Sequence, residues 1–229
     1  MRILFLHHLP LVVSEPGRLV ERWAQALLAG GHEVRALVVD DGRQAAEPFP
    51  VDRVTCSASD STAELHFPLP RFDVADGATE GVAFSQLSDG QLSEYRENLR
   101  RRLDGQIDRF NPHVLHGQHL WLQGQLALET GVPYVLNAWH DELAGPAADA
   151  RFQDLVAQAA ENASRILVPD EAVRARVAAA FDGAVDRTMI MPRELHAGAL
   201  DASVASGEIS ARLVALYQAV LEERFGQAS

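Results

Sequence analysis

Short apolar runs alternate with longer segments of helical periodicity along most of this chain. Residues 2–6 form the first apolar run and residues 36–39 form the second. Between them, one face of a helical segment carries the apolar side chains of Leu19, Trp23, Ala26 and Leu27. Gly30 and Gly31 follow that segment and are expected to end the helix. The pattern predicts a βαβ unit whose strands are covered on both faces, as in a parallel sheet.

The same alternation continues to residue 191 and is followed by one more helix. Further strands are predicted at residues 51–57, 63–68, 113–116, 134–137, 165–168 and 188–191. Helices are predicted at residues 93–110, 120–129, 147–163, 171–181 and 206–225. This order predicts an α/β fold with a single Rossmann-like, doubly wound parallel sheet. A GxGxxG fingerprint is absent from the sequence, which argues against a dinucleotide-dependent dehydrogenase.

Composition narrows the possible partners and compartments. With 20 basic and 32 acidic residues among 229, the net charge is −12, which disfavours binding to nucleic acid or to an anionic membrane. The basic run Arg100 to Arg102 is interpreted as a solvated helix face rather than as a phosphate or membrane contact. The single cysteine, Cys56, excludes an internal disulfide and is interpreted as a core residue rather than a nucleophile. We expect a cytoplasmic protein without a transmembrane segment, because no apolar run approaches the roughly 20 residues that span a bilayer.

Histidines gather at the predicted strand ends. Five of the nine fall at or just after such ends, namely His7, His8, His116, His119 and His140. The polar or aromatic residues that accompany them include Gln118, Trp139 and Asp141. Because ligands of open parallel sheets bind outside the carboxyl ends of the strands, we expect these side chains to line one crevice. Gly17 and the loop before it would let backbone N–H groups approach an anionic ligand.

No metal site and no cofactor are predicted from these residues. His113, His116 and His119 follow one another at three-residue steps, which place alternate side chains on opposite faces of a strand, so the repeat is interpreted as accidental. A mixed set would consist of His7, His116, His140 and Asp141, but no sequence pattern specifies it. The chain also has no GxSxG elbow, so nucleophilic catalysis is not predicted.

Several segments resemble, in the same order, the N-terminal domain of retaining family 4 glycosyltransferases, which have the GT-B fold. These segments are Gly31-His32-Glu33-Val34, Val132-Pro133-Tyr134, residues 160–168 and residues 189–192. The resemblance implies that His140 occupies the position of the family's near-invariant histidine, with Asp141 where glycine is usual. On this basis His140 and Asp141 are the catalytic candidates. The substrate-binding candidates are His7, His8, Gly17, His116, Gln118, His119 and Trp139.

The resemblance covers residues 1–195 and then stops. A complete family member has a second Rossmann domain, which binds the nucleotide-sugar through a basic pair and two glutamates eight residues apart. No two glutamates of this chain have that spacing. Residues 1–195 are therefore expected to form the acceptor-side half of a GT-B fold. Residues 196–229 are expected to form a linker and a helix that packs back on this half.

Three functions are compatible with these observations. The first is a glycosyltransferase half that binds a small-molecule acceptor and needs a separate donor-domain subunit. The second is a non-catalytic binding or scaffold protein that docks a glycosyltransferase, and the third is a stand-alone enzyme that uses the histidine-rich crevice. Self-association or a partner is expected at the face that a donor domain would cover, with Trp121, Leu122 and Trp139 at its rim.

Overall fold

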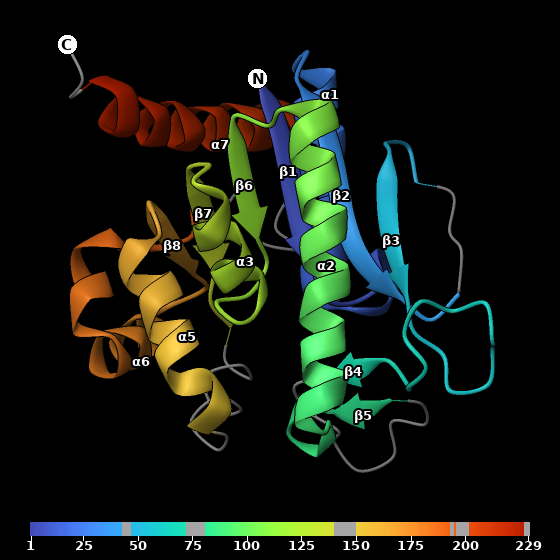
Figure 1. The fold of residues 1–229 in the computed structure, drawn as a ribbon. Coiled ribbons are helices and arrows are strands. Elements are labelled where there is room, and N and C mark those ends of the chain that lie inside the picture. Colours follow the sequence, from blue (N-terminus) through green and yellow to red (C-terminus); the bar gives the residue numbers. More distant parts are fainter. Residues whose placement is uncertain (43–46, 72–80, 140–149, 193–194, 196–201, 227–229) are drawn as a thin grey trace.

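A parallel sheet forms the centre of the computed structural model, which describes residues 1–42, 47–71, 81–139, 150–192, 195 and 202–226 (Figure 1). Its strands lie in the order β3-β2-β1-β6-β7-β8-β9. Their bounds are Arg2–His7 (β1), Glu33–Asp40 (β2), Val51–Thr55 (β3), Val114–Gly117 (β6), Tyr134–Asn137 (β7), Arg165–Val168 (β8) and Thr188–Ile190 (β9). This order confirms the predicted doubly wound sheet. It also places β1 beside β6, where the strand order reverses.

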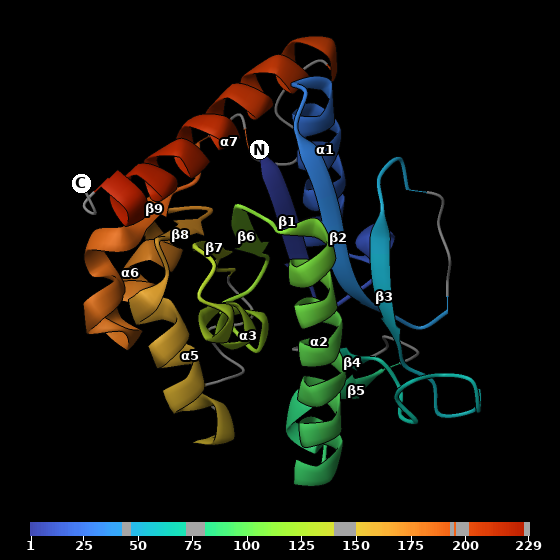
Figure 2. The same cartoon turned by 45° about the horizontal axis from the view of Figure 1, so that its top comes forward.

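Helices cover both faces of the sheet. They are α1 (Glu15–Ala29), α2 (Asp89–Phe110), α3 (Gln123–Thr130), α5 (Ala150–Asn162), α6 (Glu171–Ala180) and α7 (Ala202–Phe225). Apolar side chains of α1 and α7 form a layer on one face, and those of α2, α3, α5 and α6 form a layer on the other. Figure 2 shows α7 running obliquely past the end of the sheet and alongside α1, as expected for a bracing helix.

Capping residues fix where several helices begin and end. Ser14, Ser88 and Asp170 each accept a hydrogen bond from the backbone N–H group three residues later, at the starts of α1, α2 and α6. Asn111 and Gly131 end α2 and α3 in the left-handed conformation, with φ of 47° and 72°. These local signals keep the observed helix ends close to those that the hydrophobic pattern predicts.

The side chains of β1 alternate between the two apolar layers. Phe5 faces Trp23 of α1, with their ring centroids 6.3 Å apart. Leu4 and Leu6 point the other way, into the layer beneath α2. Because a shift of one residue would send each of these side chains to the wrong face, the alternation fixes the register of β1.

The segment after β3 corrects one part of the prediction. Residues 63–68 do not form a strand, because Leu65 makes a single parallel bridge with Cys56 and Asp60 holds the residues between them in a turn. Leu65 is nevertheless fully buried, so its side chain rather than a strand ladder anchors this segment. A small parallel sheet that the pattern did not predict follows, formed by β4 (Pro70–Arg71) and β5 (Val82–Ala83).

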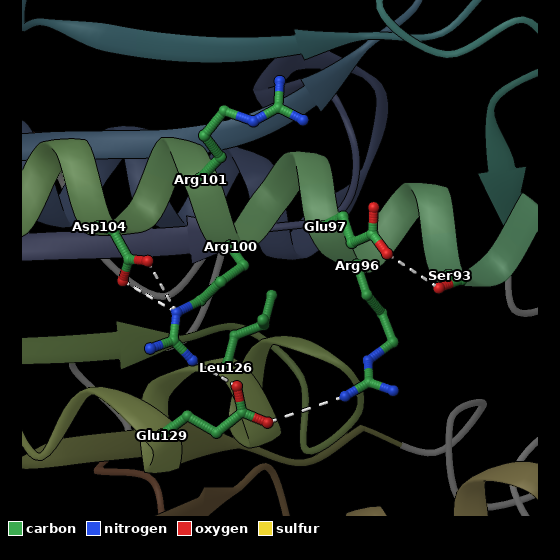
Figure 3. Close-up of a pocket in the computed structure, with 8 residues that line it drawn as sticks. All are labelled: Ser93, Arg96, Glu97, Arg100, Arg101, Asp104, Leu126 and Glu129. Carbon is green, nitrogen blue, oxygen red and sulfur yellow. Dashed lines mark hydrogen bonds and ion pairs between the residues drawn. The ribbon is translucent and has the colours of Figure 1, made fainter.

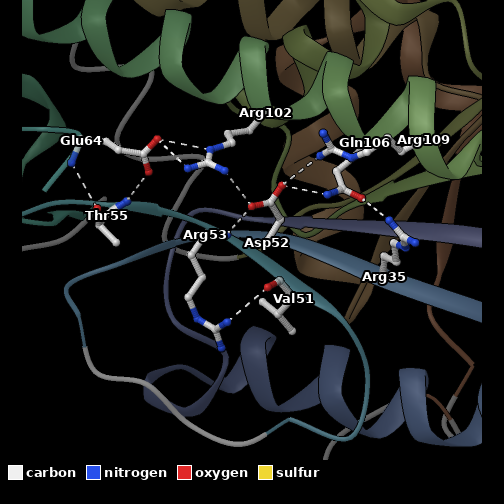
Figure 4. A network of polar contacts seen from close by, with 9 residues as sticks. All are labelled: Arg35, Val51, Asp52, Arg53, Thr55, Glu64, Arg102, Gln106 and Arg109. Carbon is white, nitrogen blue, oxygen red and sulfur yellow. Dashed lines mark hydrogen bonds and ion pairs between the residues drawn. The ribbon is translucent and has the colours of Figure 1, made fainter.

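Ion pairs connect α2 to β3 and to the segment after it (Figure 4). Arg102 donates hydrogen bonds to Asp52 over 3.3 Å and to Glu64 over 2.8 Å. On another side of α2, Arg100 pairs with Asp104 at 2.9 Å. The charges of Arg100 and Arg102 are therefore balanced by carboxylates on a partly exposed helix surface, which agrees with the interpretation of this run as a solvated surface.

Two further expectations concern Cys56 and membranes. Cys56 is buried in the apolar layer beneath α2, and burial, with a smaller contribution from nearby carboxylates, raises the pKa of its thiol. This confirms that Cys56 is a core residue. Among the helices that the structure describes, none is long and apolar enough to cross a bilayer.

Candidate functional site

Three histidines meet where β1 and β6 end. His7 is the last residue of β1, His8 follows it, and His119 lies two residues after β6. One ring nitrogen from each of the three lies within 4.8 Å of the other two. The rings of His8 and His119 contact edge to face at a centroid distance of 4.2 Å, and those of His7 and His119 stack at 5.5 Å. We call these three residues the histidine cluster.

All three side chains of the histidine cluster are buried. Burial lowers the pKa of His7 and of His8 well below the ordinary value, and the proximity of His119 lowers both further. Nε2 of His7 lies 2.9 Å from Oγ of Ser14, whereas Nδ1 of His7 has no hydrogen-bond partner among the described residues. His7 and His8 thus present neutral imidazoles at the sheet edge where α/β proteins bind ligands.

Ser14 and Gly17 connect this cluster to the start of α1. Oγ of Ser14 accepts a hydrogen bond from the backbone N–H of Gly17 over 3.0 Å. A Cβ at position 17 would lie 2.2 Å from the carbonyl oxygen of Leu11, so only glycine lets the loop Leu11–Val13 pack on the helix here. The close approach at Gly17 is therefore to Leu11, and binding of an anion by Gly17 stays a prediction.

His116 corrects the expectation that all the strand-end histidines share one crevice. It points into the apolar layer that α1 and α7 form, between Trp23 and Phe5, at ring-centroid distances of 5.3 Å from each. Its Nδ1 lies 2.7 Å from the hydroxyl of Tyr217 in α7, and its Nε2 lies 3.1 Å from Oδ1 of Asn137. Burial lowers the pKa of His116 to about 4, although the bond to Asn137 opposes this shift. The cause is the register, since His116 pairs with Phe5, two residues before His7, and therefore lies farther from the strand ends than the histidine cluster does.

Gln118 and Trp139 continue the hydrogen-bonded network of His116. Nδ2 of Asn137 donates to Oε1 of Gln118 over 2.8 Å, and the indole N–H of Trp139 donates to the carbonyl of Gln118 over 2.7 Å. Gln118 is fully buried and Trp139 half-buried. Gln118 therefore lies between the His116 network and the histidine cluster, one residue before His119.

The expected exposed rim is not formed by Trp121 and Leu122. These side chains are only 2% and 3% exposed and belong to the apolar layer, where Trp121 packs against Phe84 and Phe152. Helix α3 begins at Gln123, three residues later than predicted. The catalytic candidates His140 and Asp141 lie outside the described residues.

An open hollow between α2 and α3 is a less suitable site (Figure 3). Its volume is about 530 Å³, and its lining includes Arg96, Arg100 and Glu129. Arg96 lies 3.7 Å from Glu129, and Arg100 pairs with both Glu129 and Asp104. Because these arginines already face carboxylates, the hollow offers little positive charge to a ligand.

Sequence reasoning missed Ser14, Asn137 and Tyr217, which hold the candidate side chains in place. Ser14 was detectable, because a serine directly before a helical segment is a helix cap. Asn137 at the end of a buried strand is also a recognisable polar exception in an apolar run. Tyr217 gave no signal, since a tyrosine on an apolar helix face is ordinary core.

Solved structures share this architecture. Sucrose-phosphate synthase from Thermosynechococcus elongatus matches with a TM-score of 0.59 and 11% identity, over 84% of this chain and 48% of that protein. UDP-GlcNAc 2-epimerase from Neisseria meningitidis, bound to UDP-GlcNAc, matches with a TM-score of 0.52 and 10% identity, over 100% of this chain and 54% of that protein. HepE from Anabaena, in complex with UDP, matches with a TM-score of 0.50 and 16% identity, over 83% of this chain and 43% of that protein.

The chain thus spans about half the length of these proteins, and identities this low show the fold alone. No protein of curated function matches the sequence. The model of the glycosyl transferase 4-like domain, by contrast, matches residues 14–194. This range includes helix α1 and every strand from β2 to β9. The chain therefore belongs to the glycosyl transferase 4-like family and has the fold of one half of a GT-B glycosyltransferase.

Proposed function

We infer that this chain is the acceptor-side half of a glycosyltransferase, and that a separate donor-binding partner completes the reaction. The family match over residues 14–194 carries this proposal. The chain covers 48% and 54% of two structural neighbours and therefore corresponds to one of their halves. Two of those neighbours are complexes with UDP or UDP-GlcNAc, which supports a nucleotide-sugar as the donor.

The histidine cluster suits a small hydroxyl-bearing acceptor. A neutral imidazole has one donor and one acceptor nitrogen, and a sugar hydroxyl likewise donates and accepts. The lowered pKa of His7 and His8 favours this neutral form near neutral pH. Their position at the ends of β1 and β6 is where open parallel sheets bind ligands. The acceptor is therefore expected to contact His8 and His119.

The test separates acceptor binding from transfer. The purified chain, kept in a metal chelator, is mixed with a panel of sugars and sugar phosphates, and binding is read by saturation-transfer NMR. One or more acceptors should bind, and His8→Gln or His119→Gln should weaken that binding about tenfold, the cost of one hydrogen bond. His66→Gln, which changes an exposed histidine, is the matched control and should bind normally.

The same mixtures are then supplied with nucleotide-sugars and analysed by mass spectrometry. No product is expected from the chain alone, because positioning of both substrates supplies much of the rate of a transfer reaction. Turnover by the pure chain would favour the stand-alone enzyme instead. Absence of binding to every acceptor, with a well-folded protein, would favour the non-catalytic scaffold.

A further inference from the structure

The histidine cluster has the composition of a transition-metal site. Three buried imidazoles, from the end of β1 and from the segments that follow β1 and β6, bring one nitrogen each to within 4.8 Å of the others. In a tetrahedral site with metal–nitrogen bonds of about 2.0–2.1 Å, ligand nitrogens lie about 3.4 Å apart. Side-chain torsions therefore need to close the longest gap by about 1.4 Å at most. We propose that His7, His8 and His119 bind a divalent transition-metal ion such as Zn²⁺ or Co²⁺.

The chemistry of the imidazole ring favours a transition metal. A histidine binds such an ion through a ring nitrogen that carries a free lone pair. Imidazole also selects the ion, because it suits zinc, cobalt, nickel and copper better than it suits magnesium or calcium.

Ser14 acts as an orienting partner for His7. Metal-binding histidines usually hydrogen-bond through their second ring nitrogen, which fixes the tautomer and the ring orientation. Nε2 of His7 lies 2.9 Å from Oγ of Ser14, and in the tautomer whose Nε2–H donates to this oxygen, Nδ1 carries the free lone pair. That same Nδ1 is buried and has no hydrogen-bond partner among the described residues. A metal ion would satisfy it.

Three neutral ligands leave the ion its full positive charge. Its remaining position would then take a water molecule or an anionic group of a ligand. This inference stands on the geometry of the cluster and does not rest on glycosyl transfer.

Titration with Co²⁺ tests the proposal, because cobalt gives visible absorption that reports its ligands. The metal-free chain should bind one equivalent, and Zn²⁺ should displace it. His7→Gln and His119→Gln should each weaken binding about 100-fold or more, beyond the 10–100-fold typical of an orienting partner. Ser14→Gly, in which glycine still serves as a helix cap, should weaken it about tenfold. His66→Gln keeps the cluster intact and should bind as the wild type does.

Two results would overturn the proposal. One is the absence of saturable Co²⁺ or Zn²⁺ binding, and the other is binding that His7→Gln and His119→Gln leave unchanged. Circular dichroism checks that these variants fold. X-ray absorption of the zinc-loaded wild type gives an answer that needs no variant, since it counts the imidazoles around the ion. Three support the proposal and fewer contradict it.

Discussion

Tyr217 and His116 make a hydrogen bond of 2.7 Å between α7 and the end of β6, in a region where both side chains are fully buried. Replacing Tyr217 with phenylalanine keeps the ring packing but leaves Nδ1 of His116 without this partner. We expect the free energy of unfolding to fall by about 1–3 kcal/mol, the cost of an unsatisfied buried polar group. Urea denaturation measures this change.

Tyr95→Phe is the matched control for that variant. The hydroxyl of Tyr95 is also fully buried, but it has no hydrogen-bond partner among the described residues. Its removal should leave the stability unchanged or raise it. If Tyr217→Phe proves equally harmless, the contact with His116 contributes nothing to the packing of α7.

The buried His116 also makes stability depend on pH. Its pKa is about 4 in the folded chain, against 6.5 when exposed. Between these values the unfolded chain binds a proton that the folded chain does not, so the free energy of unfolding falls as the pH falls. The loss from this residue between about pH 7.5 and about pH 5 is about 2 kcal/mol.

His7 and His8 act in the same direction, because burial lowers the pKa of each. The contribution of His116 is therefore read as a difference between two pH profiles of urea unfolding. His116→Gln should lose less stability on acidification than the wild type does, by about 2 kcal/mol. Parallel profiles for the two proteins would show that His116 titrates alike in the folded and unfolded chain.

At the scale of elements, the loop Leu11–Val13 packs closely on α1 because Gly17 has no side chain. In Gly17→Ala, the new Cβ would lie 2.2 Å from the carbonyl oxygen of Leu11. Backbone cannot move aside as a flexible side chain can, so we expect a loss of about 3 kcal/mol in the free energy of unfolding. Gly90→Ala is the control, since no atom lies within 4 Å of its Cβ position in α2. That variant should be neutral or stabilised by up to about 1 kcal/mol.

Strands and helices were largely predictable because their signals are local. The apolar run of β1, the helical spacing in α2 and the end of α2 at Asn111 each specify an element without help from the rest of the chain. The segment 63–68 misled because a buried Leu65 and Phe67 resemble strand alternation, whereas the turn at Asp60 prevents a ladder.

The candidate site was only partly predictable from sequence. Chain order brings the ends of β1 and β6 together in any doubly wound sheet, so the meeting of His7, His8 and His119 follows from topology. The face on which His116 lies depends on the register of β6, which the pattern of four residues does not define. Its partner Tyr217 comes from a helix 101 residues away, and such pairing is invisible in the sequence.

For the whole molecule, α7 completes the apolar layer on one face of the sheet. Four buried apolar side chains of α7 pack with those of α1 in one layer, namely Ile209, Leu213, Tyr217 and Val220. Deleting residues 196–229 removes α7 and would expose the apolar side chains of α1 that this helix covers. We expect the shortened chain to lose cooperative unfolding and to bind a hydrophobic dye, because fixed packing is lost while secondary structure remains.

The substitution Leu213→Ala tests the contribution of α7 to this apolar layer without removing the helix. Leu213 is fully buried, and its truncation should cost about 2–5 kcal/mol, whereas Glu222→Ala on the exposed side of α7 should change stability by less than about 0.5 kcal/mol. Thermal and urea unfolding of both variants provide the comparison. A shortened chain that unfolds cooperatively at the wild-type midpoint would mean that residues 1–195 fold without α7. In that case α7 would be an attachment to the domain of residues 1–195 rather than part of its core.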